Sequence, residues 1–270
     1  MTIGPQDTAV TAEARLAAAL ARHGPLAVAV SGGVDSMLLM HAAHGLAAGT
    51  VAMHAVSPAV PEEATARVRR HAARAGWTLR LLDAGELADP RYAQNPVNRC
   101  FFCKENLYAR IRAATDLAIA SGANLDDLGD YRPGLDAARH AGVVHPFVEA
   151  GIGKAAIYAM AAARGLDDLA ALPAQPCLAS RIETGIPVDA ATLGFIERAE
   201  AAIGALVPGA SSVRCRVTRA GVVAEIAPLP DGPLIETVAH RLGDLAAGDG
   251  RAFAGVRPYR RGSAFLHEDP

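Results

Sequence analysis

The segment Ser31-Gly32-Gly33-Val34-Asp35-Ser36 constrains the fold most strongly, because it joins a short apolar run to a helical pattern. Its two glycines allow a tight turn with exposed backbone N–H groups, and the helix that follows adds a partial positive charge. The hydroxyls of Ser31 and Ser36 can donate hydrogen bonds to the same anion. Asp35 fits beside a phosphate only if Mg²⁺ lies between them. The alternative is a plain strand-to-helix turn, but the pattern favours a loop that binds phosphate and magnesium.

Four short runs of apolar residues define the predicted sheet, and they span residues 26–30, 50–56, 78–82 and 117–120. Because the apolar residues are continuous rather than alternating, both faces of the sheet should be covered, as in parallel sheets with crossover helices. Helical patterns at 36–47, 61–75, 104–114 and 153–164 fit between and after these runs. We therefore expect an α/β fold with a doubly wound parallel sheet, whose ligands bind beyond the carboxyl ends of the strands.

The pattern changes near residue 188. A helix at 189–206, strands at 213–217 and 222–226, a helix at 234–242 and a strand at 253–256 follow in that order. This order predicts a smaller α+β domain, and it places the boundary so that the domains are 1–187 and 188–270.

Composition argues against several classes of protein. The net charge is −2, which gives no basic field for nucleic acid. No apolar run reaches the ~20 residues needed to cross a membrane, and the first residues lack the pattern of a signal peptide. We expect a cytoplasmic protein, whose four cysteines are candidates for chemistry or metal binding. Arg67, Arg69, Arg70 and Arg74 should form the solvated face of a helix.

The hexapeptide lacks the Lys-Ser/Thr ending of a Walker loop and the third glycine of a dinucleotide fingerprint. At this position it closely resembles the PP-loop of the N-type ATP pyrophosphatases, enzymes of the adenine nucleotide alpha hydrolase-like fold that cleave ATP between the α and β phosphates. The resemblance implies binding of ATP and Mg²⁺, with Asp35 on the metal. The expected nucleotide contacts are Ser31, Gly32, Gly33, Val34, Asp35, Ser36, His54, Ser57, Asn124, Asp127, Arg132, Ser180 and Arg181.

Downstream motifs narrow the choice among PP-loop enzymes. They are DYRPGL at 130–135, PCLASRI at 176–182, TGIP at 184–187, VRCR at 213–216 and YRRGS at 259–263. Together they resemble the LarE family of sulfur transferases, which help to build the nickel-pincer nucleotide cofactor. The similarity runs from about residue 15 to residue 263. It implies adenylation of a carboxylate of pyridinium-3,5-biscarboxylic acid mononucleotide with release of pyrophosphate. A sulfur nucleophile then displaces AMP and leaves a thiocarboxylate. The family also implies a homo-oligomer.

Arg214 and Arg216 are two residues apart, which puts both on one face of a strand. The resemblance makes them a clamp for the substrate's phosphate or carboxylate, where spacing alone would equally allow an exposed charged face. Glu200 and Glu225 occupy positions where the family carries acidic residues near substrate or metal. Cys215 should point to the opposite strand face and serve the structure.

The remaining cysteines suggest two sources of sulfur. Cys177 matches the family's sulfur-bearing cysteine, which in one branch gives up its own sulfur. Cys100 and Cys103 form a C-x-x-C motif at the start of a helix, next to Arg99 and Lys104, where thiolates are favoured. Cys100, Cys103 and Cys177 are therefore expected to hold a [4Fe–4S] cluster with one open iron, which passes on sulfide from a sulfur donor. A redox dithiol, a zinc half-site and an incidental buried pair remain alternatives for the motif.

Two other functions stay open at this point. A PP-loop enzyme that thiolates tRNA would also use cysteines, although the charge and the lack of an added RNA-binding domain count against it. A sensor that binds ATP without turnover is the second, and the intact Asp35 counts against that reading.

Overall fold

A computed structural model of the chain describes residues 5–129, 132–260 and 262–263, with side chains from residue 9 onward. The chain divides into two compact units. Unit 1 comprises Met1–Glu86 and Cys100–Gln175, and unit 2 comprises Leu87–Arg99 and Pro176–Pro270. Asp130 and Tyr131 of the DYRPGL motif and Arg261 of the C-terminal motif lie outside the described residues.

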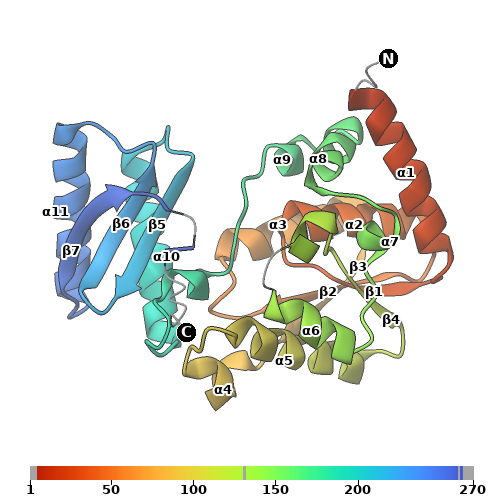
Figure 1. Ribbon diagram of the computed structural model, residues 1–270, viewed down its shortest axis with the longest axis horizontal. Coiled ribbons are helices and arrows are strands. Elements are labelled where there is room, and N and C mark those ends of the chain that lie inside the picture. Colours follow the sequence, from red (N-terminus) through yellow and green to blue (C-terminus); the bar gives the residue numbers. More distant parts are fainter. Residues whose placement is uncertain (1–4, 130–131, 261, 264–270) are drawn as a thin grey trace. The chain divides into compact units, whose positions relative to one another are not determined.

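Unit 1 is built on a four-stranded, entirely parallel sheet in the order β3-β2-β1-β4 (Figure 1). Its strands are β1 (Leu26–Ala29), β2 (Val51–Val56), β3 (Thr78–Asp83) and β4 (Ala118–Ser121). Each agrees with a predicted apolar run to within a residue or two, and the expected α/β class is confirmed. The helices are α1 (Pro5–Ala21), α2 (Val34–Leu46), α3 (Glu62–Ala75), α5 (Arg99–Ala114), α6 (Pro133–His140), α7 (Pro146–Glu149), α8 (Lys154–Ala163) and α9 (Asp167–Ala170), with the short 3₁₀ turn η2 (Leu125–Gly129). The 3₁₀ turn η1 (Glu86–Ala88) crosses from unit 1 into unit 2.

Helices cover both faces of this sheet, as the continuous apolar strands require. Leu26 and Val28 of β1 pack in a cluster with residues of α1, α2, α3, α8 and α9. Ala27, between them, belongs to a second cluster with residues of α5 and α6. This alternation along one strand separates the two layers of core. In the part of the chain that the structure describes, no helix is both long enough and apolar enough to cross a membrane.

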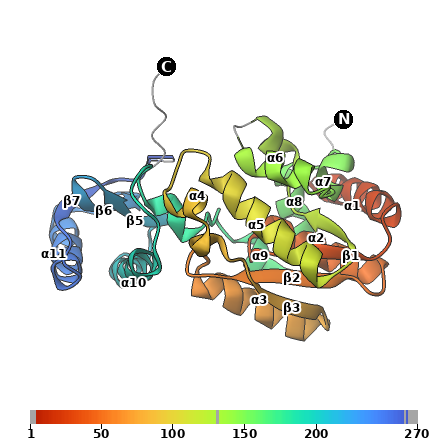
Figure 2. The same cartoon turned by 90° about the horizontal axis from the view of Figure 1, so that it is seen from below.

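Unit 2 contains a three-stranded sheet in the order β5-β6-β7. Strands β5 (Ser212–Thr218) and β6 (Gly221–Ala227) are antiparallel, and β7 (Phe253–Pro258) lies parallel to β6. The helices α10 (Ala190–Leu206) and α11 (Gly232–Gly248) pack against each other and against one side of this sheet (Figure 2). A short helix α4 (Pro90–Ala93) and a 3₁₀ turn η3 (Leu178–Arg181) complete the unit.

The segment 87–99 belongs to unit 2 because its backbone pairs with residues far along the chain. Val188 donates a backbone hydrogen bond to Ala93, and Gly185 donates one to Asn95, at 2.8 and 2.9 Å. The buried Asn95 side chain donates to the carbonyl groups of Glu183 and Ile186, both at 2.8 Å. The chain enters unit 2 for the second time at Pro176. The sequence pattern places the end of the first domain at residue 187, eleven residues later.

Candidate functional site

The loop Ser31–Ser36 follows β1 at the carboxyl edge of the parallel sheet, and α2 begins within it at Val34. The Oγ atoms of Ser31 and Ser36 lie 3.1 Å apart, and the Ser31 N–H donates to Ser36 Oγ at 3.0 Å. Gly33 caps α2 without a side-chain hydrogen bond. The first N–H groups of α2 therefore have no side-chain cap, which is the arrangement that suits an anionic ligand.

Two glycines give this loop its shape. Gly32 has a φ of +84°, and a Cβ there would lie 2.7 Å from the Ala64 carbonyl oxygen. Gly122, after β4, packs directly on the start of α2, since a Cβ there would lie 2.6 Å from the Ser36 nitrogen. Both positions therefore require glycine. Close contact with Gly122 ties the loop to the neighbouring strand.

The position of Arg67 differs from the solvent-exposed position that the sequence predicted. Arg69, Arg70 and Arg74 are exposed as predicted, but Arg67 is only 5% exposed. Its guanidinium donates to the Gly32 carbonyl oxygen at 2.9 Å and to Gln175 Oε1 at 3.1 Å. Since α3 faces the loop at this position, Arg67 turns inward and supports the loop. The helical pattern alone could not identify which of four arginines does so.

Asp35 forms an ion pair with Lys154, a residue that the sequence pattern did not identify as part of the site. Lys154 Nζ donates to both carboxylate oxygens of Asp35, at 2.8 and 2.6 Å. Asn124 Nδ2 donates to Asp35 Oδ1 at 3.3 Å. One signal could have found this residue: only two of the chain's 26 basic residues are lysines, and the other is Lys104 of the C-x-x-C segment.

The turn after β4 orders the rest of this site. Asp127 Oδ2 accepts the Asn124 backbone N–H at 3.0 Å, and Asp127 Oδ1 lies 3.0 Å from Arg132 Nη1. Asn124 itself is 3% exposed. The structure thus brings Asp35, Asn124, Asp127 and Arg132 into one connected network in unit 1. Asp127 reaches Asp35 through Asn124 rather than directly.

Ser57 directly follows β2, whereas His54 lies within that strand and its side chain is an internal support. It is fully buried, with Nδ1 2.7 Å from the Val30 carbonyl oxygen and Nε2 2.9 Å from Thr65 Oγ1. Burial lowers its pKa, so the neutral ring donates from Nδ1 to Val30 and accepts at Nε2 from Thr65. Ser57 Oγ accepts the Ala59 N–H at 3.0 Å and closes a turn.

Cys177 is exposed at the start of η3 in unit 2. The Arg181 guanidinium holds the backbone around it, donating to the carbonyl oxygens of Pro176 and Cys177 at 2.7 and 3.1 Å. Arg181 also forms a two-pronged pair with Glu200, at 2.9 and 3.0 Å. Ser180 Oγ accepts from the same guanidinium at 3.0 Å. Arg181, Ser180 and Glu200 together therefore fix the backbone that presents the Cys177 thiol.

The paired arginines of β5 have different surroundings. Arg216 is 4% exposed, and its Nε donates to the fully buried Glu225 at 2.8 Å. Arg257 and Ser263 also donate to Glu225, at 3.0 and 2.8 Å. Arg214 lies over the ring of Tyr259, 5.9 Å from its centroid, and burial lowers its pKa. Arg216 is thus committed to an internal ion pair, whereas Arg214 is in a half-buried, aromatic setting.

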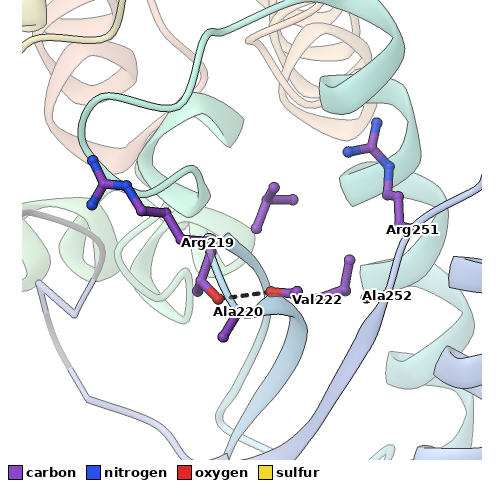
Figure 3. Close-up of a pocket in the computed structure, with 8 residues that line it drawn as sticks. Arg219, Ala220, Val222, Arg251 and Ala252 are labelled. Atoms are coloured by element: carbon purple, nitrogen blue, oxygen red, sulfur yellow. Dashed lines mark hydrogen bonds between the residues drawn. The ribbon is translucent and has the colours of Figure 1, made fainter.

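A cavity of about 520 Å³ adjoins this network within unit 2. Its lining comprises Glu225, Arg257, Pro258, Arg260, Gly262 and Ser263. A smaller cavity of about 240 Å³ lies at the turn between β5 and β6, where Thr218 donates to the Gly221 carbonyl oxygen (Figure 3). Arg219 and Arg251 line that smaller cavity, but each is paired with a carboxylate, Glu183 and Asp249 respectively. In the larger cavity Arg257 is likewise paired with Glu225, so the pairing of arginines does not distinguish the two cavities.

The four cysteines fall into three settings. Cys100 and Cys103 are half-buried near the start of α5, and Cys177 belongs to the other unit. Cys215 is fully buried, as expected for a structural residue, and burial raises the pKa of its thiol. Within either unit, the described side chains bring no three His, Cys, Asp or Glu residues together as a metal site.

The chain is similar to two curated proteins. Over 202 residues it is 37% identical to the uncharacterized protein slr1717 from Synechocystis sp., which covers 70% of this chain and 71% of that protein. Over 191 residues it is 26% identical to the uncharacterized protein MJ0830 from Methanocaldococcus jannaschii, which covers 69% of this chain and 72% of that protein. No protein-family model matches the chain.

Proposed function

The chain belongs to the same protein family as slr1717 of Synechocystis, and we propose that it is an ATP pyrophosphatase that adenylates a carboxylate and then transfers sulfur to it. The observation that carries the proposal is the loop Ser31–Ser36, where the first N–H groups of α2 have no side-chain cap. In this loop the carboxylate of Asp35 already pairs with a positive charge, the ammonium group of Lys154. The fold of unit 1 is proposed to be that of the PP-loop enzymes.

Asp35 has the chemistry that a magnesium site requires. Its carboxylate holds the ammonium group of Lys154, so a positive charge already stands where a metal ion would bind. Mg²⁺ is commonly held by one or two carboxylates together with substrate phosphates. When bound, Mg²⁺ would supply charge neutralisation for the departing pyrophosphate. The N–H groups at the start of α2 and the hydroxyls of Ser31 and Ser36 would bind the phosphate oxygens.

The proposed reaction has two balanced steps. A substrate carboxylate oxygen attacks the α phosphorus of ATP, the bond to the β-phosphate oxygen breaks, and pyrophosphate leaves. Hydrosulfide then attacks the acyl carbon, AMP leaves with the original oxygen, and a thiocarboxylate and a proton result. The first step converts a poor leaving group into a good one, which is why ATP is consumed.

For the substrate we propose the pyridinium biscarboxylic acid mononucleotide of the LarE family. Its phosphate and carboxylates need cationic partners, and unit 2 carries a cavity lined by Arg260, beside Arg257, which is paired with Glu225. Arg214 would contact substrate, because its half-buried guanidinium stacks on Tyr259 rather than being committed to Glu225. Arg216 would instead position Glu225 and the Ser180 carbonyl group, to which it donates at 2.8 Å.

For the sulfur step we propose that Cys100, Cys103 and Cys177 ligate a [4Fe–4S] cluster. Cys100 and Cys103 are three residues apart on α5, a spacing that puts both thiols on one helix face. Iron and acid-labile sulfide in protein purified without oxygen test this directly. About four of each per chain, lost in Cys100→Ala, supports the cluster. Negligible iron after reconstitution contradicts it and makes Cys177 the sacrificial sulfur donor.

Pyrophosphate release tests the adenylation step. The purified protein should release pyrophosphate from Mg·ATP only when the mononucleotide is present, and Asp35→Asn should slow release by about 100-fold or more because it removes a metal ligand. Asp116→Asn, at an exposed position in the same unit, is the matched control and should be unaffected. Cys177→Ala should still release pyrophosphate but form no thiocarboxylate.

If no carboxylate supports release of pyrophosphate, the chain is a nucleotide sensor. Salt-sensitive tRNA binding would instead favour a tRNA thiolase.

A further inference from the structure

The ion pair between Lys154 and Asp35 occupies the metal-binding group of the proposed nucleotide site. Both carboxylate oxygens of Asp35 accept from the same ammonium, at 2.8 and 2.6 Å. The two side chains are 33% and 26% exposed, so a ligand can reach them. While this pair is intact, the lone pairs that face Lys154 cannot also bind a divalent cation.

The backbone fixes where the lysine starts. Lys154 is the first residue of α8, and its N–H donates to Asp126 Oδ2 at 2.6 Å. A Cβ on Gly153 would lie 2.7 Å from the same oxygen, so Gly153 lets the Asp126 carboxylate approach the start of α8 closely. Asp126 belongs to the turn that also carries Asn124, the second donor to Asp35. The backbone of Lys154 is therefore anchored to this site, and its long four-carbon stem carries the ammonium group to Asp35.

The residue type is informative in this chain. The sequence uses arginine for 24 of its 26 basic residues, yet an ammonium stands beside Asp35. A guanidinium is planar and forms two fixed parallel hydrogen bonds with a carboxylate, which favours a permanent pair such as Arg181 with Glu200. An ammonium is a compact point charge on a flexible stem, and it can exchange one anionic partner for another.

We propose that Lys154 is an exchangeable cation of the phosphate loop: it neutralises Asp35 when nucleotide is absent, and it moves to a β- or γ-phosphate oxygen when Mg·ATP arrives and the metal takes the carboxylate. This rests on the proposed binding of ATP. The exchange keeps Asp35 paired with a cation in both states. It also brings a positive charge to the pyrophosphate that leaves, so Lys154 acts on the substrate as well as on Asp35.

The first test measures binding of Mn²⁺, as a spectroscopic substitute for Mg²⁺, to the full chain without nucleotide. Lys154→Gln should bind Mn²⁺ at least about fivefold more tightly than the unaltered protein, because the competing cation is gone. Asp35→Asn should lose this binding. Arg164→Gln is the matched control, since Arg164 lies about 15 Å along the same helix and forms a comparably exposed ion pair with Glu13. It should leave Mn²⁺ affinity unchanged.

The second test measures nucleotide affinity by calorimetry. Lys154→Gln should weaken binding of Mg·ATP by about 10- to 100-fold, the usual effect of losing a hydrogen bond to a charged group. AMP, which has neither the β nor the γ phosphate, should bind equally to both proteins. Lys154→Arg keeps the charge and should retain the low Mn²⁺ affinity of the unaltered chain, which separates charge competition from loss of folding.

The proposed function and the proposed exchange can be contradicted independently of each other. If the unaltered protein does not bind Mg·ATP, the proposed function is wrong. If it binds Mg·ATP but Lys154→Gln binds Mn²⁺ no more tightly and ATP no more weakly, then only the exchange is overturned, and the pair with Asp35 is a permanent structural contact.

Discussion

Arg67 donates a hydrogen bond of 2.9 Å to the carbonyl oxygen of Gly32, so a side chain of α3 holds the turn that follows β1. The guanidinium is buried, and it reaches across 35 residues of sequence. Because Gly32 lies in the proposed phosphate loop, this bond couples the packing of α3 to the shape of the loop.

Replacing Arg67 with glutamine should therefore weaken ATP binding by about tenfold and cost about 1–3 kcal/mol of stability, since it leaves the Gly32 carbonyl oxygen without this donor. Isothermal calorimetry and urea unfolding measure the two effects. Arg70→Gln, on the same helix but 53% exposed at its side chain, is the control and should change neither. Equal behaviour of the two variants would mean that the loop keeps its shape without Arg67.

Gly122 provides a second test of the loop. A methyl group at this position would lie 2.6 Å from the Ser36 nitrogen and 2.8 Å from the Asp35 carbonyl carbon, so the start of α2 must shift. Gly122→Ala should thus reduce nucleotide affinity by about tenfold or more and destabilise unit 1 by about 1–3 kcal/mol, as overpacking does. Gly129→Ala, seven residues later and with open space around its Cβ position, should be neutral. Normal ATP binding by Gly122→Ala would show that the contact can relax.

The secondary structure of unit 1 could be predicted well because its determinants are local. The apolar run at 26–30 corresponds to β1, and the helical pattern at 61–75 corresponds to α3 (Glu62–Ala75). The helix α1 (Pro5–Ala21) was missed. Its alanine-rich sequence has weak amphipathic character, and its burial depends on packing against α8, which lies far along the chain.

The site was predictable only where one motif contains the whole arrangement. Ser31–Ser36 is such a motif. By contrast, the pairing of Lys154 with Asp35 spans 119 residues, and the assignment of 87–99 to unit 2 depends on the bond from Gly185 to Asn95. Contacts of this kind leave no periodicity in one sequence. The roles of Arg216 and Glu225 likewise depend on which side chains close around them.

Glu225 should be essential for the stability of unit 2. It is fully buried between Arg216, Arg257 and Ser263. Glu225→Gln keeps the shape but leaves Arg216 buried without its counter-ion, and breaking such a pair costs about 3–5 kcal/mol. Urea unfolding followed by circular dichroism should show this loss. The exposed Glu236→Gln on α11 serves as the control. A loss below about 1 kcal/mol would mean that water or another group compensates Arg216.

Three hydrogen-bonded side chains of unit 1 should make the stability of the protein depend on pH. His41 Nε2 lies 2.9 Å from His71 Nδ1, and His71 Nε2 lies 2.8 Å from Asp168 Oδ2. Burial of His41, and then the nearby His71, lowers the pKa of His41 from 6.5 to about 4. Between pH 6.5 and about pH 4, His41 binds a proton in the unfolded chain but not in the folded chain. The contribution of His41 to the free energy of unfolding is therefore fully present above pH 6.5 and falls as the pH decreases towards 4.

The unfolding temperature should therefore decrease by several degrees between pH 7 and pH 4.5. His41→Gln should flatten this part of the curve, because it removes the group that must gain a proton. His240→Gln, at a side chain 85% exposed, should leave the curve unchanged. Burial also lowers the pKa of His54, so His41→Gln should reduce the slope without abolishing it. A slope identical in all three proteins would show that folding does not change the pKa of His41.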